Sequence, residues 1–248
     1  MNLTDRRVSF LLAFPQEGKP VSDEDRSVER FFDSLTDDYT STIERCFPRY
    51  REMLWALLDY LPETMHAESI LELGTGTGNL TGLLVERYPD ATITAVDVSA
   101  DSLDACRSRL GEDRVTYQQA DFRNLDYAAD SFDLVASSIS VHHLTAGEKQ
   151  KLFGCIFHWL KPGGVFAYCD QHAGATDDLY QRHLENWNRV SKQAGSTSQE
   201  WEMWMQHQRQ HDHHDILGDQ MRWLTEAGFH VVDCPWRYLL WTVLQARK

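Results

Sequence analysis

Three glycines stand at alternate positions in the sequence, Gly74, Gly76 and Gly78, between an apolar run and a segment with helical spacing. Glycine allows the backbone to turn tightly and lets a ligand approach the backbone amides. A dinucleotide-binding loop has the spacing G-x-G-x-x-G. Because the spacing here is G-x-G-x-G, the loop favours a ligand without a diphosphate.

Asp97 ends the next β-branched run, 19 residues after Gly78. A carboxylate at this place can accept hydrogen bonds from both hydroxyls of a ribose. The alternative is a helix N-cap, although Ser99 could fill that role. Together with the glycine loop, Asp97 predicts a nucleoside ligand.

Two pairs of polar residues follow later apolar runs. His142 and His143 are candidates for a general base or for a contact to the substrate that accepts a transferred group, because imidazole titrates near neutral pH. Asp170 and His172 form a second pair, and both pairs would lie within reach of one cleft at the carboxyl ends of the strands. The alternatives are histidines packed under a loop and, for the second pair, a turn or capping role.

A histidine-rich run invites a metal interpretation. Its members are His207, His211, Asp212, His213, His214 and Asp215. Histidines four apart share one face of a helix, but the spacing fixes no third ligand and the run is polar throughout. We therefore predict a solvated segment or the edge of a lid, with no metal bound.

The same region holds three further candidates for substrate contacts. Trp201 and Trp204 lie three apart and could form an apolar or cation-binding wall, although such pairs also pack in cores. Arg209 could pair with a carboxylate on a ligand.

Composition excludes several classes of protein. The formal net charge of −14, without a Lys/Arg-rich stripe, disfavours nucleic acid as a partner. The 5 cysteines are widely spaced and form no C-x-x-C pair, which is typical of reduced thiols in a cytoplasmic protein. The apolar run Phe10–Phe14 is too short to span a membrane and lacks a cleavage site, so we expect neither membrane insertion nor export.

Short apolar runs alternate with helical segments through the middle of the chain. The predicted strands are Ser69–Leu73, Thr92–Val96, Val115–Gln119, Phe132–Ser137 and Val165–Asp170, and the predicted helices are Leu80–Arg87, Ala100–Leu110 and Ala146–Trp159. This alternation predicts an α/β fold with a Rossmann-like, doubly wound, mostly parallel sheet.

We expect an N-terminal arm followed by one domain over residues 26–248. The expected parts are the arm at 1–25, N-terminal helices at 26–64, a ligand-binding core at 65–173, a helical cap inserted after the fifth strand at 174–217, and a C-terminal helix (Asp219–Ala227) and strands (Val231–Cys234 and Tyr238–Gln245) at 218–248. The aromatic-rich insertion and the N-terminal helices could pair between chains, so a homodimer is possible.

These motifs resemble the class I S-adenosylmethionine-dependent methyltransferases over roughly residues 65–170 and again at the C-terminal strands. The glycine loop resembles their first motif, Asp97 their ribose-binding acid, Gln119–Phe122 their adenine-binding segment, and Phe132–Ser138 the strand and loop beside the sulfonium. The cofactor contacts that the resemblance implies are Glu72, Gly74, Thr75, Gly76, Gly78, Asp97, Val98, Ala120, Asp121, Phe122, Ser137 and Ser138.

The resemblance implies transfer of a methyl group from S-adenosylmethionine to an unidentified small molecule, with S-adenosylhomocysteine as product. The segments Arg45–Tyr50 and Trp236–Leu240 are similar in layout to carboxy-S-adenosylmethionine synthase, which would need a cation such as Arg182 or Arg209 in its pocket. A non-catalytic nucleoside-binding module is another alternative. A short-chain dehydrogenase is disfavoured, because the chain has no Tyr-x-x-x-Lys pair.

Overall fold

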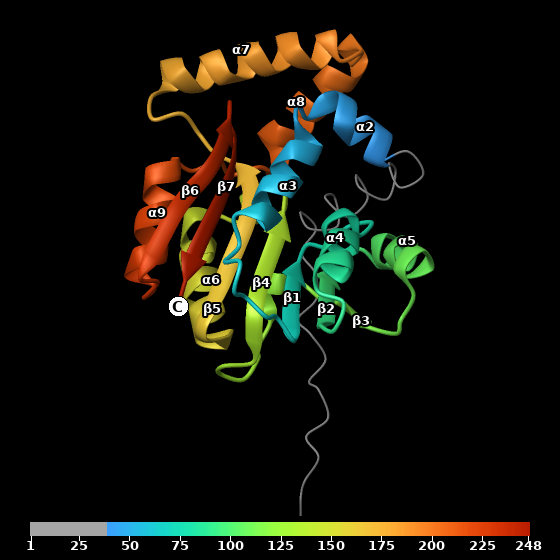
Figure 1. Cartoon of the computed structure of the whole chain (residues 1–248). Coiled ribbons are helices and arrows are strands. Elements are labelled where there is room, and N and C mark those ends of the chain that lie inside the picture. Colours follow the sequence, from blue (N-terminus) through green and yellow to red (C-terminus); the bar gives the residue numbers. More distant parts are fainter. Residues whose placement is uncertain (1–38) are drawn as a thin grey trace, which may run out of the picture.

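The computed structural model of the protein describes residues 39–248 (Figure 1). The predicted arm at residues 1–25 and the first part of the predicted N-terminal helices lie outside the described residues. The described part begins with helices α2 (Tyr39–Cys46) and α3 (Tyr50–Asp59), within the range where apolar spacing predicts helices. Pro48 and Arg49, which has a φ of 63°, separate the two helices.

Seven strands form one sheet in the order β3-β2-β1-β4-β5-β7-β6. Their bounds are β1 Ser69–Leu73, β2 Thr92–Asp97, β3 Val115–Gln119, β4 Phe132–Ser138, β5 Leu160–Gln171, β6 Val231–Tyr238 and β7 Trp241–Arg247. Neighbouring strands pair in parallel except at β7, which is antiparallel to β5 and β6. The doubly wound, mostly parallel sheet is therefore confirmed, and its strand order reverses between β1 and β4.

The hairpin of the last two strands corrects a predicted boundary. The sequence predicts one strand over Tyr238–Gln245, whereas Tyr238 ends β6 and Trp241 begins β7. Leu239 has a φ of 55°, so Leu239 and Leu240 form the connecting turn. Such turns usually carry Gly, Asn or Asp, and an apolar pair hides the turn from a pattern-based prediction.

Helices cover both faces of the sheet. The helices of the core are α4 (Asn79–Arg87), α5 (Ala100–Leu110), α6 (Ala146–Trp159) and α9 (Leu217–Glu226). Successive strand residues point to opposite faces, so Ile70 packs in a core with Leu84 of α4 while Leu71 packs in a second core with Phe153 of α6. No helix within residues 39–248 is long and apolar enough to cross a membrane.

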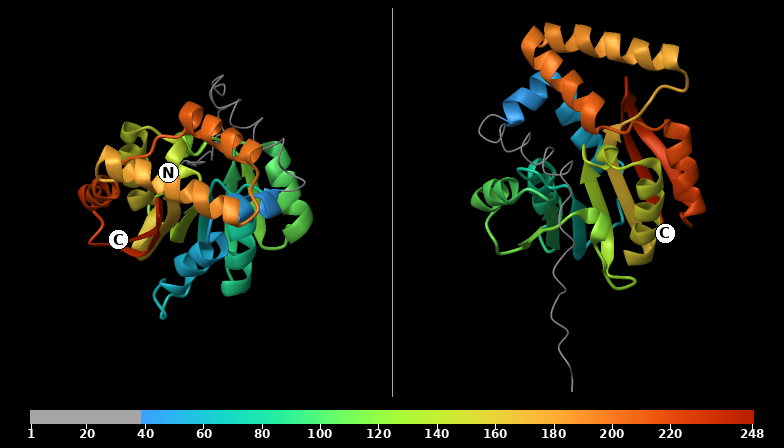
Figure 2. Two further views of the ribbon diagram at one scale, coloured as in Figure 1. Left: turned by 90° about the horizontal axis from the view of Figure 1, so that it is seen from above. Right: turned by 180° about the vertical axis from the view of Figure 1, so that it is seen from behind.

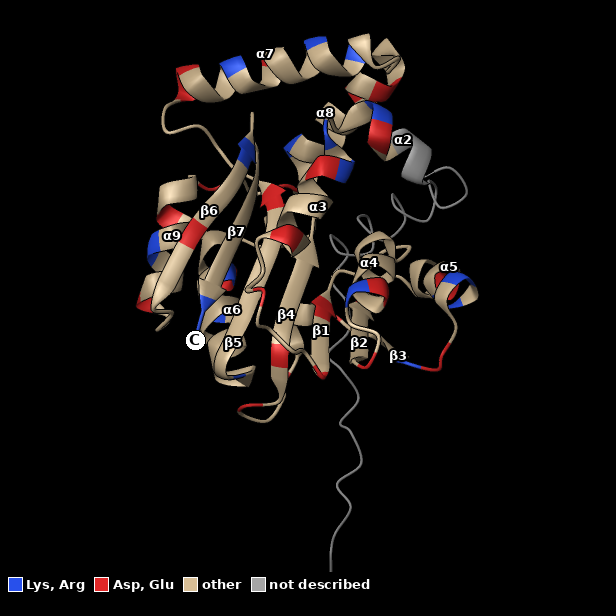
Figure 3. Cartoon of the chain, viewed as in Figure 1, with Lys and Arg blue, Asp and Glu red and all other residues tan. Residues whose placement is uncertain are grey.

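Two further helices, α7 (Asp177–Gln193) and α8 (Ser198–His211), lie beyond the carboxyl ends of the strands and are called the cap (Figures 1 and 2). The hydroxyl of Thr176 caps α7, and Thr197 and Glu200 form a capping box at the start of α8. Charges of both signs follow one another along α7 (Figure 3). These local signals start each cap helix at a defined residue.

An aromatic cluster packs the cap against the N-terminal helices and the sheet. The ring of Phe47 lies 4.9 Å from Trp204, 5.6 Å from Trp187 and 5.7 Å from Trp241. The indole nitrogen of Trp187 also donates a hydrogen bond to the carbonyl oxygen of Cys46 at 2.5 Å. Because large aromatic side chains bury much apolar surface, the cap is part of the packed structure.

Residues 212–216, called the return segment, lead from α8 back to the core. The backbone amide of His213 donates to the carbonyl oxygen of His142 at 2.7 Å. The fully buried ammonium of Lys149 lies 2.6 Å from a carboxylate oxygen of Asp215 and also donates to the carbonyl oxygen of His213. The return segment is therefore fastened to the loop that follows β4.

Candidate active site

A cleft opens at the carboxyl ends of β1, β2 and β4, where the strand order reverses. Its volume, including space open to solvent, is about 1450 Å³. Open α/β sheets bind ligands at this position. The predicted contacts that line it are Glu72, Gly74, Thr75, Gly76, Asp97, Val98, Ala120, Asp121, Phe122, Ser138 and His143.

The glycine loop has a backbone that side chains would disturb. Gly74, Gly76 and Gly78 all have positive φ, at 71°, 54° and 85°. A Cβ on Gly74 would lie 2.3 Å from the hydroxyl of Ser140, and one on Gly78 would lie 2.3 Å from the sulfur of Cys106. Gly78 does not line the cleft but caps α4, so its role is to let the chain turn into that helix.

Asp97 lies at the end of β2 and faces the cleft. Its carboxylate accepts hydrogen bonds from the backbone amides of Gly76 at 2.7 Å and Ser99 at 2.9 Å. The N-cap of α5 is Ser99, whose hydroxyl accepts from the amide of Ser102. The helix-capping alternative for Asp97 is therefore wrong, and its carboxylate instead braces the glycine loop.

Glu72 is the buried acid beneath the loop. Its side chain is 1% exposed and lines the cleft, and neither carboxyl oxygen has a hydrogen-bond partner within residues 39–248. Burial raises the pKa of this carboxyl to about 8, with Asp97 adding to the rise. An orphaned buried carboxyl at a cleft fits a cationic ligand group, such as the ammonium of a methionine moiety.

Asp121 and Phe122 lie where β3 leads into the short helix η2 (Phe122–Asn124). The carboxylate of Asp121 caps η2 by accepting from the amide of Arg123 at 2.9 Å, and it also pairs with the guanidinium of Arg123 at 2.7 Å. Asp121 therefore has a structural role in the turn after β3. Both residues also line the cleft, where a ligand ring can reach them.

The two adjacent serines at the end of β4 have different environments. Ser138 lines the cleft. Ser137 is fully buried, and its hydroxyl donates to the carbonyl oxygen of Leu73 at 2.8 Å and lies 2.8 Å from the hydroxyl of Ser140. The predicted ligand contact by Ser137 is corrected, since alternation along the strand turns its side chain inward to join β4 to the glycine loop.

The two candidate catalytic histidines also separate. They lie in the short helix η3 (Val141–His143), where His143 lines the cleft and His142 is buried behind it. Nδ1 of His142 lies 2.5 Å from the carboxylate of Asp170. Burial opposes both charges, but the attraction between the two groups prevails, so it raises the pKa of His142 and lowers that of Asp170 to about 2.

The pair Asp170 and His172 does not reach the cleft, contrary to prediction. Both side chains are buried, and neither lines the cleft. Asp170 orients His142, and Nδ1 of His172 lies 3.0 Å from the hydroxyl of Thr242. Burial lowers the pKa of His172 to about 4. Strand β5 continues to Gln171, so Asp170 lies within the strand and contacts His142, while His172 follows the strand directly and contacts β7.

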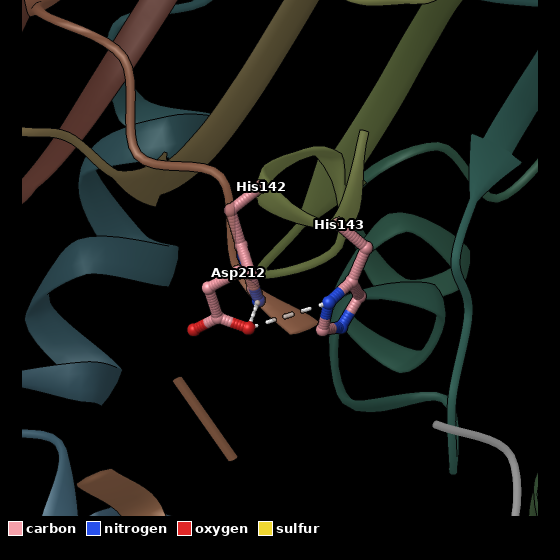
Figure 4. Close-up of side chains that lie close together, drawn as sticks. All are labelled: His142, His143 and Asp212. Atoms are coloured by element: carbon pink, nitrogen blue, oxygen red, sulfur yellow. Dashed lines mark ion pairs between the residues drawn. The ribbon is translucent and has the colours of Figure 1, made fainter. Parts of the chain in front are cut away.

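The histidine-rich run is divided between the cleft and a buried part, because His211 and the exposed His213 line the cleft while other members are enclosed. The side chains of His207, Asp212 and His214 are each 4% exposed. Figure 4 shows the carboxylate of Asp212 pointing toward the rings of His142 and His143, with dashed lines joining it to both rings. The buried members of the run are polar side chains that contact one another.

The remaining substrate candidates lie away from the cleft. Trp204 packs on Phe47, and the ring of Trp201 lies 4.9 Å from Trp187. Arg209 pairs with Glu202 on the exposed side of α8, and its side chain is 62% exposed. The two tryptophans therefore pack α8 against the aromatic cluster and do not line the substrate side of the cleft.

Some residues that line the cleft were not predicted from the sequence, and others come from the histidine-rich run. Tyr50 of α3 and Asn79 of α4 line the cleft, and the amide of Asn79 donates to the hydroxyl of Tyr50 at 3.3 Å. His211 and His213 line it from the cap side. Asn79 follows the glycine loop directly and could have been inferred, whereas Tyr50 shows only the helical spacing of a core residue.

Known proteins share this domain. A model of a methyltransferase domain matches residues 70–164. An uncharacterized methyltransferase of Anoxybacillus flavithermus is 24% identical over 212 residues, which are 85% of this chain and 93% of that protein. A trans-aconitate 2-methyltransferase of Azoarcus sp. is 38% identical over 101 residues, which are 41% of this chain and 38% of that protein.

A solved structure shares the fold. Human N-acetylserotonin methyltransferase in complex with S-adenosylmethionine aligns with a TM-score of 0.57 and 18% identity, over 89% of this chain and 55% of that chain. The fold, the matching domain and the cleft together define a methyltransferase. The methyltransferase domain over residues 70–164, the methyltransferase relatives and the shared fold support the class I S-adenosylmethionine-dependent methyltransferase superfamily, with S-adenosylmethionine as the cofactor.

Proposed function

We propose that the protein transfers the methyl group of S-adenosylmethionine to a small molecule in the cleft and releases S-adenosylhomocysteine. The sulfonium of this cofactor supplies an activated methyl group. The protein therefore has mainly to align the two reactants and exclude water. The observation that carries the proposal is the pair of cleft acids at the glycine loop, the orphaned Glu72 and the loop-bracing Asp97.

The chain offers a different group to each part of the cofactor. Glu72 would hold the ammonium of the methionine moiety, because a buried carboxyl gains most from a cationic partner. Asp97 would accept hydrogen bonds from the ribose hydroxyls. Asp121 would accept from the adenine amino group, while Phe122 packs on the ring.

The acceptor would lie at the other end of the cleft, between the loop after β4 and the return segment. His143 comes from the first of these, and His211 and His213 come from the cap side. His143 is the candidate contact to the acceptor, because it alone of the two predicted histidines lines the cleft and an imidazole N–H can donate a hydrogen bond to the acceptor. The match to trans-aconitate 2-methyltransferase covers 38% of that protein, so the acceptor is inferred from this chain's own residues.

Modification of the cofactor itself, as in carboxy-S-adenosylmethionine synthase, has weaker support. A carboxylated cofactor needs a cation facing the cleft. Arg182 and Arg209 are both exposed on the cap and do not line the cleft. Arg123 does line it, but its guanidinium pairs with Asp121.

The test is calorimetric titration of S-adenosylmethionine into the Asp97→Ala variant. We expect a loss of about 1.5 to 3 kcal/mol in binding free energy, the scale of hydrogen bonds to a charged group. Asp101→Ala is the matched control, because Asp101 is exposed in the first turn of α5 and outside the cleft. Equal affinity of both variants would contradict the ribose role. Binding without turnover of any acceptor would favour the non-catalytic module.

A further inference from the structure

We propose that His142, His143 and Asp212 form a binding site for one divalent transition-metal ion, which joins the cap to the core beside the cleft. A ligand atom from each residue lies within 4.8 Å of the other two. The two histidines follow β4, and Asp212 follows α8 (Figure 4). The site is therefore made of two segments about 70 residues apart that only the fold brings together.

The distances around Asp212 are typical of ligand atoms that surround an ion. Its Oδ1 lies 3.6 Å from Nε2 of His142 and 3.4 Å from Nδ1 of His143. Charge-assisted hydrogen bonds are about 2.7 to 2.9 Å long, so these contacts are too long for them. Around a tetrahedral ion with bonds of about 2.0 to 2.1 Å, neighbouring ligand atoms stand about 3.3 to 3.4 Å apart. The observed separations are close to this edge length.

The burial of Asp212 is a second observation that favours a bound ion. Its side chain is 4% exposed, and its Oδ1 makes no hydrogen bond within the described part of the chain. A third imidazole nitrogen, Nε2 of His207, lies 3.7 Å from this oxygen, and Nε2 of His214 lies 3.5 Å from Oδ2 of Asp212. A buried carboxylate oxygen that faces three imidazole nitrogens at these separations has room for a metal ion among them, and such an ion would compensate its charge.

The surrounding residues orient the proposed ligands as outer partners do in metal sites. Nδ1 of His142 lies 2.5 Å from Asp170, which directs Nε2 of the same ring toward Asp212. Ligating histidines commonly make this second bond to a carboxylate. The ammonium of Lys149 pairs with the carboxylate of Asp215, outside the triad. These contacts hold the rings in place.

The ligand types limit the kind of ion. Imidazole nitrogens suit Zn²⁺, Co²⁺ and Fe²⁺, whereas Mg²⁺ and Ca²⁺ prefer all-oxygen sites. His143 also lines the cleft, and His142 and Asp212 line a small cavity on the other side. The ion would thus lie in the wall between the cleft and the interior of the cap, where it fastens the return segment to η3.

The first test uses the untagged full chain without S-adenosylmethionine, so that its outcome is independent of the proposed methyl transfer. After treatment with a chelator, Zn²⁺ and Co²⁺ are titrated by calorimetry, with Mg²⁺ as the control. We expect one equivalent of Zn²⁺ or Co²⁺ to bind, no binding of Mg²⁺, and a rise in the melting temperature. Bound Co²⁺ should absorb visible light more strongly than Co²⁺ in buffer, and an unchanged spectrum would overturn the proposal.

Variants then assign the ligands. We expect Asp212→Asn and His143→Gln to abolish the one-equivalent binding, and Asp170→Asn to weaken it by about 10- to 100-fold, as loss of an outer partner does. The matched controls are Asp101→Asn and His158→Gln, at exposed positions remote from the triad, which should bind the ion as the original chain does. Circular dichroism of the metal-free variants checks their folding. Metal binding by folded Asp212→Asn equal to that of the original chain would overturn the proposal.

Discussion

The two ends of the cleft are built from different kinds of sequence. At the cofactor end, the glycine loop and Asp97 lie close together in the chain, and backbone geometry fixes them: three positive φ angles and a carboxylate bonded to the amide of Gly76. At the cap end, His142, Asp170 and Asp212 meet through packing between distant segments. A local motif can be recognised from its spacing, whereas a site assembled by tertiary packing cannot.

The largest expected effect comes from removing a side chain of the aromatic cluster that packs the cap, which tests whether the two ends of the cleft are stabilised separately. Replacing Phe47 with Ala removes the ring shared by Trp187, Trp204 and Trp241, and the free energy of unfolding should fall by about 3 to 5 kcal/mol, as for other buried aromatics. Urea denaturation measures the loss. Trp55→Ala is the control, because that side chain is 57% exposed and its removal should change stability by less than about 0.5 kcal/mol.

The affinity for S-adenosylmethionine should be unchanged in Phe47→Ala under conditions in which the variant is folded. Phe47 does not line the cleft, and the cofactor contacts belong to the other end of it. Loss of cofactor binding in the folded variant would show that the two ends do not act separately.

The complementary change is made at the cofactor end. In Gly74→Ala the added Cβ meets Ser140 at a φ of 71°, and strain and overpacking should cost about 2 to 3 kcal/mol of stability. Calorimetry should also show weaker binding of S-adenosylmethionine. Gly147→Ala, in α6 with no atom within 4 Å of the new Cβ, should be neutral or slightly stabilising. Equal stability of the two variants would contradict the proposed geometry.

Glu72→Gln probes the buried acid alone. The amide keeps the shape of the side chain but cannot carry a charge, so we expect affinity for S-adenosylmethionine to fall by about 1.5 to 3 kcal/mol. Glu148→Gln provides a control at a carboxyl that lines the cleft but is bonded to the Thr145 amide and hydroxyl. Normal cofactor binding by the Glu72→Gln variant would remove the ammonium role.

The same variant has a signature in its pH dependence. The folded-state pKa of Glu72 is about 8, above the unfolded value of about 4.3. Between these values the folded chain holds a proton that the unfolded chain has lost, so this carboxyl lowers stability as the pH rises. Relative to the original chain, Glu72→Gln should therefore gain stability from about pH 5 to about pH 8. A constant difference in melting temperature across that range would contradict the raised pKa.

The smallest effect is expected where the cap meets α2 at the surface. Arg45 and Glu200 form an ion pair at 3.0 Å, with side chains 38% and 22% exposed. Solvent screens such pairs, so Arg45→Ala should lower the free energy of unfolding by at most about 1 kcal/mol. Added salt should reduce the difference from the original chain, and a larger, salt-independent loss would show that Arg45 supports the cap in another way.

Local signals explain which parts of the fold were predictable. Helix α5 has the predicted bounds Ala100–Leu110, because Ser99 caps its start and Gly111 ends it. The turn at Leu239 and Leu240 was not predictable, since nothing in these residue types indicates a positive φ. The parallel strands followed from their short apolar runs.

Two aspartates show the limit for the candidate site. Asp97 was predictable because a strand before it and a glycine loop near it define its place. Asp212 stands in a polar run, which indicates solvent exposure when read alone. Its burial depends on the packing of Trp204 and Phe47, which brings α8 onto the core. No spacing in the sequence records that contact.

The most direct test of the central claim is to identify what the cleft holds. The untagged protein is purified and denatured, and any released nucleoside is identified by mass spectrometry, with calorimetry of added S-adenosylmethionine and S-adenosylhomocysteine on the same preparation. We predict that one of these compounds is released or that both bind at one site. A protein that releases no adenosyl compound and binds neither would contradict the assignment of the glycine loop, Glu72 and Asp97 to the cofactor.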